Sequence, residues 1–378
     1  MRFVVDARYA GPAVSGIGSY VRALAARLPD LAPEARFRFW VRPGTPRLST
    51  ARNVEEPRVR SVPAGLATLL WPSRLDALSE GDVFHGPANI LGFGIPCPAI
   101  VTVHDVMWLE HLEWCQPRPY LRPVSHAYYS TGILRALRLS ERLLTVSRAS
   151  ADAIVRVEPS AHAKIEVTPN ACEPHFRAPA SLEAARASAA RLLGFDEPFF
   201  LVVGQNQPSK GHAVAVRAFA EARVPRYRLV LVQRLDRGKG LHRLVRELGI
   251  EDRVTFASGL SEAGLVASLQ SASALLQPSL AEGFGLPALE AMASGAPVVA
   301  SDIPPLREVL GGAGLLFETG SVAECARAIR SVANEPSLAA ELRARGLERA
   351  KDFSWDHTAR ATLDVYRDVA SRPRRVAD

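Results

Sequence analysis

The amino-acid sequence predicts an α/β protein built from two Rossmann-like domains, each a doubly wound parallel sheet. Short β-branched runs alternate with helical segments along all 378 residues, and this alternation is typical of parallel sheets with helices on both faces. A chain of this length commonly exceeds one hydrophobic core, and an alanine-rich polar stretch at 178–198 separates two sets of runs. We therefore expect domains at 1–185, joined by a C-terminal helix over 356–378, and at 186–355.

Apolar runs with the length and β-branched content of buried strands occur in both halves of the chain. Polar or glycine-containing segments bound each run, and amphipathic stretches separate those of the second half most clearly. In the first domain we expect strands at 2–7, 37–42, 82–86, 99–105, 142–147 and 164–170. In the second domain we expect strands at 199–204, 227–233, 253–259, 273–279, 296–302 and 314–318.

Charge and cysteine content exclude several classes of function. The chain has 46 basic and 39 acidic residues, but only four of the basic residues are lysines, a bias that reflects genome composition more than nucleic-acid binding. Because the sequence contains no basic tail, zinc-finger spacing or aromatic RNA-binding motif, we expect no nucleic-acid partner. Four scattered cysteines are typical of reduced thiols in a cytosolic protein, and no apolar stretch approaches the roughly 18 residues of a membrane span. The sequence predicts a cytoplasmic protein with at most peripheral contact at the inner face of the cell membrane.

Polar and glycine-rich residues gather in four loops that follow predicted strands. These loops come after the strands at 2–7, 99–105, 199–204 and 273–279. In doubly wound sheets the ligand binds beyond the carboxyl ends of the strands. Two domains that present such loops to each other would form a cleft, and we expect the site there.

The segment AEGFGLPALEAMASGAPVVASD, at 281–302, predicts an anion site at the start of a helix. Pro287 suits the first helical turn, and Gly295 suits the position after the helix ends. The helix N-terminus offers unpaired N–H groups and a partial positive charge. Gly283 and Gly285 allow a ligand to approach the backbone closely.

Two glutamates, Glu282 and Glu290, flank this turn. A carboxylate only accepts hydrogen bonds, so it suits a ligand that carries hydroxyl groups. A nucleotide sugar is both anionic and polyhydroxylated, and it would use the N–H groups and the carboxylates together. Structural alternatives remain open: Glu290 as a residue that interacts with the helix dipole, and Glu282 as a solvated loop charge.

The segment resembles the signature of retaining glycosyltransferase family 4, the group 1 transferases with a GT-B fold, whose two glutamates are separated by seven residues. Other segments resemble the same family in the right order: SGIGSYVRAL, TVHDVMWLEHLEW, LLTVSRASADAI, VTPNACEPHF and the terminal FSWDHTARATLDVY. The VHD triplet with Trp108 is similar to mannosyltransferase-like members. The resemblance implies two Rossmann-like domains that face each other across a cleft, and transfer of a sugar from a nucleoside-diphosphate donor to an acceptor hydroxyl with retention.

The resemblance also implies roles for individual residues. Glu282 and His104 would be the catalytic residues facing the transferred sugar, Glu290 would bind the ribose, and Lys210 would neutralise the diphosphate. Lys210 as a solvated loop residue and His104 as a structural histidine are the alternatives. The implied donor-binding residues are Gly16, Ile17, Gly18, Gln205, Lys210, Gly283, Phe284, Gly285, Leu286 and Glu290.

Two positions bear on how far the resemblance extends. Gln205 stands where many members carry an arginine on the diphosphate, and Arg234 or Lys239 is a candidate for the missing charge. The glycines of the SGIGSY loop are followed by Val21 where a dinucleotide fingerprint needs a third glycine. This argues against the first alternative function, a nicotinamide-dependent oxidoreductase.

The resemblance favours GDP-mannose as donor and a glycan or lipid-linked acceptor, in polysaccharide or lipid-linked glycan synthesis. Open alternatives are a UDP-sugar donor with a small-molecule acceptor, and a non-catalytic sugar-nucleotide-binding partner. We expect no cofactor and no metal, because the sequence lacks a DxD motif and histidines at ligand spacing.

A basic stretch of the first domain suggests a membrane-facing surface. From Arg118 to Lys164 the chain has eight basic and three acidic residues, and such a surface with apolar residues can rest on anionic headgroups. The alternative is a core-packed helix with a solvated arginine face. The interleaved apolar residues are Tyr120, Tyr128, Tyr129, Ile133, Leu134 and Leu137.

Overall fold

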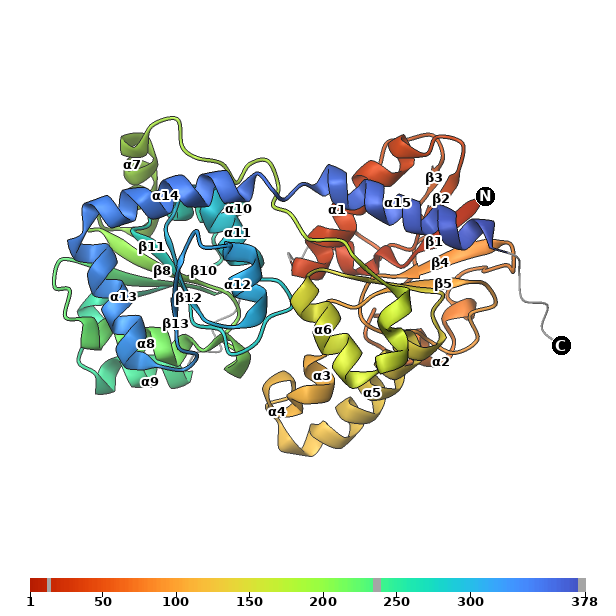
Figure 1. The fold of residues 1–378 in the computed structure, drawn as a ribbon, viewed down its shortest axis with the longest axis horizontal. Helices are drawn as coiled ribbons and strands as arrows, with labels where there is room; N and C mark the ends of the chain where they lie inside the picture. Colours follow the sequence, from red (N-terminus) through yellow and green to blue (C-terminus); the bar gives the residue numbers. More distant parts are fainter. Residues whose placement is uncertain (12–14, 234–238, 373–378) are drawn as a thin grey trace. The chain divides into compact units, whose positions relative to one another are not determined.

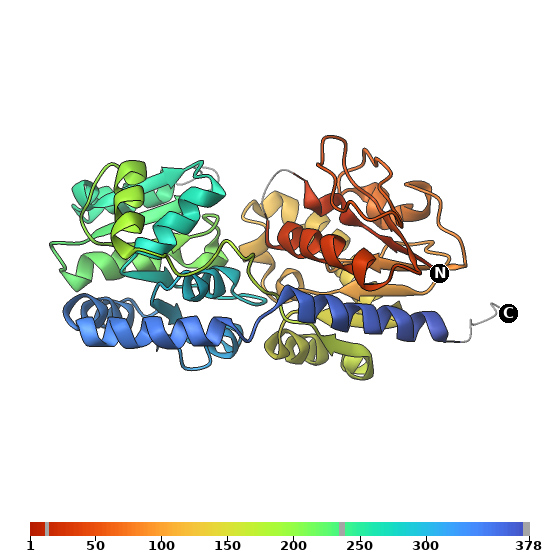
Figure 2. The same cartoon turned by 90° about the horizontal axis from the view of Figure 1, so that it is seen from above.

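The computed structural model describes residues 1–11, 15–233 and 239–372. The chain forms two compact units, one of Met1–Asn170 with Ser354–Asp378 and one of Ala171–Phe353 (Figures 1 and 2). Each unit holds one wholly parallel sheet covered by helices, so the predicted α/β class is confirmed.

Seven parallel strands form the sheet of the first unit, in the order β3-β2-β1-β4-β5-β6-β7. Six of them lie where the sequence predicts strands. β3 was not predicted, because its valine and glutamate carry no apolar run and only pair along β2 at the edge of the sheet. The strands are β1 (Arg2–Val5), β2 (Arg36–Phe39), β3 (Val54–Glu55), β4 (Asp82–Gly86), β5 (Ala99–Thr102), β6 (Arg142–Thr145) and β7 (Ile165–Val167).

The helices of the first unit include the C-terminal helix, which packs on α1. Trp355 and Tyr366 of this helix lie against Tyr20 and Phe3, with ring centroids 6.1 and 4.9 Å apart. This burial of aromatic surface fixes the C-terminal segment to the first unit. The helices are α1 (Gly16–Leu31), α2 (Leu66–Leu70), α3 (Met107–Glu110), α4 (Leu112–Cys115), α5 (Arg122–Leu139), α6 (Arg148–Val157) and α15 (Trp355–Ser371), with 3-10 helices η1 (Ala7–Ala10), η2 (Pro72–Arg74), η3 (Pro119–Leu121) and η4 (Pro159–Lys164).

Helix α5 carries most of the apolar residues for which the sequence suggested a membrane-facing surface. Ile133 and Leu137 are 0% exposed and belong to the core beneath the sheet, while Tyr129 stacks on Trp108. Among the six apolar residues, Tyr120 is the one that is largely exposed, at 73%. The structure therefore favours the packed-helix alternative for this region. Among the described residues, no helix has the length and apolar character needed to cross a membrane.

Six parallel strands form the sheet of the second unit, in the order β10-β9-β8-β11-β12-β13, and all six were predicted. A core of Phe200, Phe219, Leu229, Leu276 and Ile329 joins this sheet to its helices. The strands are β8 (Phe199–Val203), β9 (Arg228–Gln233), β10 (Val254–Ser258), β11 (Ala274–Gln277), β12 (Val298–Ser301) and β13 (Leu315–Phe317). The helices are α7 (Leu182–Leu193), α8 (His212–Ala222), α9 (Lys239–Glu247), α10 (Glu262–Ser271), α11 (Leu286–Ala293), α12 (Pro304–Leu310), α13 (Val322–Asn334) and α14 (Pro336–Ala350), with η5 (Pro208–Lys210) and η6 (Glu251–Arg253).

The first boundary between the units lies at Asn170, earlier than the expected 185. Helix α7 packs against α10, and the Gln270 Nε2 donates a hydrogen bond to the Arg177 carbonyl at 2.8 Å. These contacts place the segment after Asn170 in the second unit. The second boundary lies after Phe353 instead of 355, because α15 begins there and packs on the first unit.

Both sheets reverse their strand order once. The reversal lies between β1 and β4 in the first unit and between β8 and β11 in the second. At such a switch point the loops beyond neighbouring strands diverge to opposite faces and leave room for a ligand. The loops after β8 and β11 are those that carry Lys210 and Glu282.

Candidate active site

The turn before α11 is held in a backbone conformation that glycine favours. Gly285 has φ +107°, and a Cβ there would lie 2.5 Å from the Leu306 side chain. Pro287 lies in the first turn of the helix, and Gly295 follows its end with φ +80°. The predicted start and end of this helix are therefore confirmed.

Helix α11 presents its N-terminal backbone donors at this turn. Within the described residues, the N–H groups of Phe284, Gly285 and Leu286 meet no acceptor. The Phe284 side chain is buried against Phe353, which holds the backbone of the turn in place. Three N–H groups at a helix N-terminus suit an anionic oxygen.

Lys210 and Glu282 form an ion pair beside this turn. The Lys210 Nζ lies 2.7 Å from Glu282 Oε1 and 2.8 Å from Oε2. The Glu282 side chain is largely buried, while that of Lys210 is about a quarter exposed. The structure thus brings together the two charged residues that the sequence placed on separate loops.

Gly211 brings the two loops together. It has φ +62°, and a Cβ there would lie 1.9 Å from the Pro278 carbonyl oxygen. The Leu280 N–H donates a hydrogen bond to the Ser209 carbonyl at 2.7 Å in the same place. The backbone of the Lys210 loop therefore lies directly on the loop that carries Glu282.

Glu290 lies in the second turn of α11 and is half-buried. Burial and, to a smaller extent, the nearby charge of Glu290 together raise the pKa of the Cys172 thiol to about 12. The carboxylate of Glu290 is thus placed on the side of α11 near Cys172. Its role toward a ribose stays a prediction.

The first unit places Gly16, Ile17 and Gly18 at the N-terminus of α1. Ser15 caps this helix: its Oγ accepts a hydrogen bond from the Gly18 N–H at 2.9 Å. A Cβ at Gly18 would lie 2.7 Å from the Tyr9 carbonyl oxygen. The Gly18 N–H is therefore used inside the unit, while the N–H groups of Gly16 and Ile17 meet no acceptor among the described residues.

His104 follows β5 and is buried. Its Nε2 lies 2.9 Å from the Pro87 carbonyl oxygen, and a carbonyl only accepts, so Nε2 carries the proton and Nδ1 carries the lone pair. Burial lowers the pKa of His104 to about 4. The imidazole is therefore neutral at physiological pH, and it forms a T-shaped contact with the Tyr20 ring at a centroid distance of 5.2 Å.

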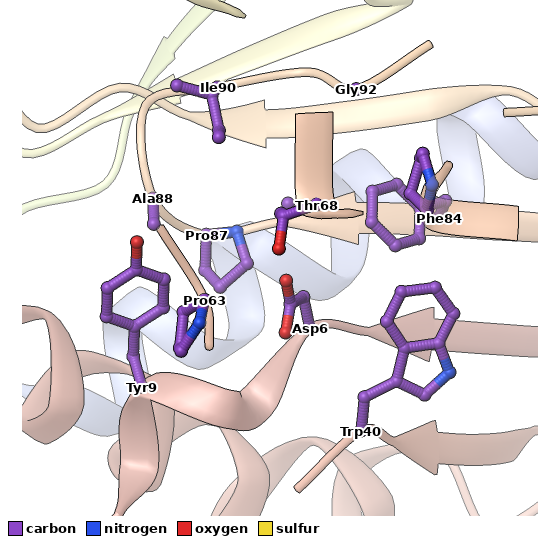
Figure 3. Close-up of a pocket in the computed structure, with 12 residues that line it drawn as sticks. Asp6, Tyr9, Trp40, Pro63, Thr68, Phe84, Pro87, Ala88, Ile90 and Gly92 are labelled. Carbon is purple, nitrogen blue, oxygen red and sulfur yellow. The ribbon is translucent and has the colours of Figure 1, made fainter. Parts of the chain in front are cut away.

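A small cavity lies beyond β1 and β4 in the first unit (Figure 3). Its volume is about 20 Å³, enough for roughly one water molecule. Asp6 provides its carboxylate, which is bound by the Arg8 guanidinium at 2.6 Å. Arg8 also donates to Ser61 and Thr68, so this buried ion pair is fully hydrogen-bonded. The lining includes Tyr9, Trp40, Phe84, Pro87 and Ala88.

Comparisons with known proteins bear on the activity. A family model described as "Glycosyl transferases group 1" matches residues 186–351, which include the Lys210–Glu282 pair. The D-inositol 3-phosphate glycosyltransferase of Stackebrandtia nassauensis is 30% identical over 410 residues, covering 95% of this chain and 89% of that protein. The chain belongs to the group 1 glycosyltransferases.

Two further proteins are similar to this group 1 glycosyltransferase over most of its length. The MMP alpha-(1->4)-mannosyltransferase of Mycolicibacterium hassiacum is 32% identical over 283 residues, covering 73% of this chain and 66% of that protein. The sucrose-phosphate synthase from Thermosynechococcus elongatus has a TM-score of 0.74 at 23% identity, covering 97% of this chain and 98% of that one. The two Rossmann-like units thus have the predicted GT-B fold.

In this glycosyltransferase, Gln205 occupies an exposed position after β8. Its side-chain oxygen accepts a hydrogen bond from Gln207 Nε2 at 3.3 Å. Of the candidates for a replacement charge, Arg234 lies outside the described residues, and so does the side chain of Lys239. The structure therefore places Gln205 near Lys210 in the same loop and leaves the source of a second charge untested.

Two residues that contact Glu282 in this candidate site were missed from the sequence. Ser279 Oγ and Gln277 Nε2 donate to Glu282 Oε1 at 2.8 and 3.2 Å. A glutamine at the end of the otherwise apolar run SALLQ was the available signal, because a polar residue at the carboxyl end of a buried strand points to a site. Gln233 also ends its strand, β9, but its Nε2 donates to His212 Nδ1 at 3.2 Å and so meets a different partner from that of Gln277.

Proposed function

We propose that this protein is a retaining glycosyltransferase that moves a sugar from a nucleoside-diphosphate donor to an acceptor hydroxyl. The observation that carries the proposal is the Lys210–Glu282 ion pair beside the N-terminus of α11. One cation from the loop after β8, three N–H donors and one carboxylate then lie together at the N-terminus of α11. This combination matches a ligand that is anionic at one end and hydroxylated at the other.

The diphosphate of the donor would bind to the N–H groups of Phe284, Gly285 and Leu286 and to Lys210. Charge-assisted hydrogen bonds of this kind are strong. The charge on the leaving diphosphate grows as the sugar departs, and donors already in place stabilise that charge most in the transition state. Lys210 thereby exchanges part of its contact with Glu282 for a phosphate oxygen.

Glu282 would accept hydrogen bonds from hydroxyls of the transferred sugar, and Glu290 from the ribose. His104 is the second proposed catalytic residue. Its neutral imidazole, with Nδ1 as acceptor, suits a hydroxyl group. The leaving phosphate takes the proton of the acceptor hydroxyl on the same face from which it departs, so the anomeric configuration is retained.

We propose GDP-mannose as the donor and a glycan or lipid-linked acceptor. The mannosyltransferase similarity at 32% identity supports this choice of sugar. The alternative is a UDP-sugar donor with a small-molecule acceptor. The similarity to a D-inositol 3-phosphate glycosyltransferase supports the small-molecule acceptor.

Among a panel of nucleotide sugars, GDP-mannose should raise the melting temperature of the protein most, because binding stabilises the folded state by mass action. Thermal shift with GDP-mannose, UDP-glucose and UDP-N-acetylglucosamine measures this preference, and nuclear magnetic resonance of the product reads the anomeric configuration. A larger shift with a UDP-sugar would overturn the donor assignment. An inverted product would overturn the retaining mechanism, and donor binding without transfer or hydrolysis would indicate the non-catalytic alternative.

Turnover should be unchanged by a chelator. Lys210 and the N–H groups of the α11 turn supply the positive charge for the diphosphate, so no divalent cation is required in this proposal. Initial rates of transfer with and without EDTA measure the effect. Loss of turnover in EDTA that magnesium or manganese restores would contradict the expected metal independence.

A further inference from the structure

The two carboxylate oxygens of Glu282 have different surroundings. Oε1 accepts from the Lys210 ammonium at 2.7 Å, from Ser279 Oγ at 2.8 Å and from Gln277 Nε2 at 3.2 Å. Oε2 accepts from Lys210 at 2.8 Å. A carboxylate has about four lone-pair sites over its two oxygens, so Oε1 is filled by protein donors and Oε2 keeps room for a further donor.

Gln277 holds this arrangement from inside the sheet. It is the last residue of β11 and is 4% exposed. Its side-chain oxygen is buried and meets no donor among the described residues, which costs free energy. Rotating the amide by half a turn would set its oxygen against the Glu282 carboxylate, so the NH₂ group must face Glu282. One end of the amide is thus left unpaired in order that the other end can bind the carboxylate.

The turn of α11 passes directly over the Gln277 amide. A Cβ on Gly285 would lie 3.7 Å from Gln277 Nε2. Gln277 therefore contacts the carboxylate and underlies the turn that supplies the N–H groups. A shift of this side chain would move the acceptor and the donors of the site relative to each other.

We propose that Gln277 is a positioning residue that fixes the Glu282 carboxylate, with Oε1 held and Oε2 presented to a hydroxyl of the donor sugar. The proposal rests on the proposed function of the site. When Lys210 shifts to the diphosphate, Gln277 and Ser279 still hold Oε1. The orientation of the carboxylate is then the same before and after the donor binds.

Gln233 provides a matched control. It also ends a strand at the same edge of the sheet, β9, and it is also 4% exposed. Its amide donates to His212 and does not contact Glu282. Replacing it by methionine makes the same chemical change at the same depth, without touching the carboxylate.

The test compares Gln277→Met and Gln233→Met in the wild-type protein and in a Glu282→Gln background. Gln277→Met should lower kcat/KM by about 10- to 100-fold, because the rate falls steeply when a catalytic group such as the Glu282 carboxylate is misplaced. In the Glu282→Gln background the same change should cost less than about twofold, since the two residues act as one unit. Gln233→Met should stay within about twofold in both backgrounds. The melting temperature of Gln277→Met should change little, because methionine removes the costly unpaired oxygen together with the stabilising hydrogen bond to Glu282.

A binding measurement distinguishes an effect on contacts to the sugar from an effect on contacts to the nucleotide. Calorimetry compares GDP-mannose with GDP, and UDP-glucose with UDP. Gln277→Met should weaken binding of the nucleotide sugar and leave binding of the nucleoside diphosphate unchanged. Three outcomes would overturn the positioning role and leave the proposed function standing. They are an equal loss of kcat/KM in both Glu282 backgrounds, an equal loss of kcat/KM from Gln233→Met, and equally weakened binding of the nucleotide sugar and the nucleoside diphosphate. A wild-type protein that bound and transferred neither nucleotide sugar would overturn the proposed function itself.

Discussion

Replacing Glu282 or Lys210 by alanine should lower the rate of sugar transfer by about 10²- to 10³-fold, the loss of roughly 2.7–4 kcal/mol of transition-state stabilisation. Glu282→Ala removes the acceptor for the sugar hydroxyls, and Lys210→Ala removes the cation that meets the leaving diphosphate. The fold should survive both changes. The Lys210 ammonium is partly exposed to water, and the Glu282 carboxylate keeps its hydrogen bonds from Ser279 and Gln277 when the lysine is absent.

Initial transfer rates with the preferred donor measure this effect, and circular dichroism with thermal melting checks the fold. Lys351 and Glu348 form a lysine–glutamate pair of similar length, 2.6 Å, on the exposed surface at the end of α14. Lys351→Ala and Glu348→Ala are therefore matched controls and should turn over at the wild-type rate. Wild-type turnover in both Lys210→Ala and Glu282→Ala would remove these residues from the site.

Local patterns were enough to predict the parts of the fold that depend on neighbouring residues. Runs such as FFLVV and ALLQ are apolar because both faces of a parallel strand are buried, and β8 and β11 lie where these runs occur. Pro287 predicted the start of α11 and Gly295 its end, because a fixed φ and a left-handed residue are requirements of the backbone itself. Neither requirement depends on the rest of the chain.

Contacts between distant loops could not be predicted in this way. Lys210 and Glu282 are separated by 72 positions, and the resemblance gave each a role without pairing them. Their contact depends on Gly211 lying against Pro278, which only the packed structure shows. Gln277 and Ser279 were missed for the same reason, since nothing in the run SALLQPS states which neighbour each side chain meets.

Burial decides properties that residue type leaves open. The sequence allowed His104 to be catalytic or structural, and the Pro87 carbonyl fixes which ring nitrogen carries its proton. The apolar residues of α5 suited a membrane or a core, and the exposed fraction of Ile133 places it in the core. The domain boundary likewise moved to Asn170, because an alanine-rich helix looks the same in sequence whether it links two units or packs on one.

Gly211→Ala should destabilise the second unit by about 2–5 kcal/mol and abolish most transfer. An alanine in the left-handed conformation costs roughly 1–2 kcal/mol, and forcing a methyl group into packed backbone costs roughly 1–3 kcal/mol more. The Cβ would lie 1.9 Å from the Pro278 carbonyl oxygen, so the two loops must separate. Because Lys210 precedes Gly211, its ammonium would move away from Glu282, and a displacement of about 1 Å costs on the order of 100-fold in rate.

Gly194→Ala is a control that separates the cost of the left-handed backbone from the cost of the steric clash at Pro278. Gly194 also has a left-handed φ, +81°, but a Cβ there would meet nothing within 4 Å. Gly194→Ala should therefore cost only the roughly 1–2 kcal/mol of the left-handed backbone and keep wild-type turnover. Thermal melting of both variants and initial transfer rates measure the difference. If Gly211→Ala melted and turned over like Gly194→Ala, the approach of the two backbones at Pro278 would not be what positions Lys210, and the ion pair would have to be held by its side chains alone.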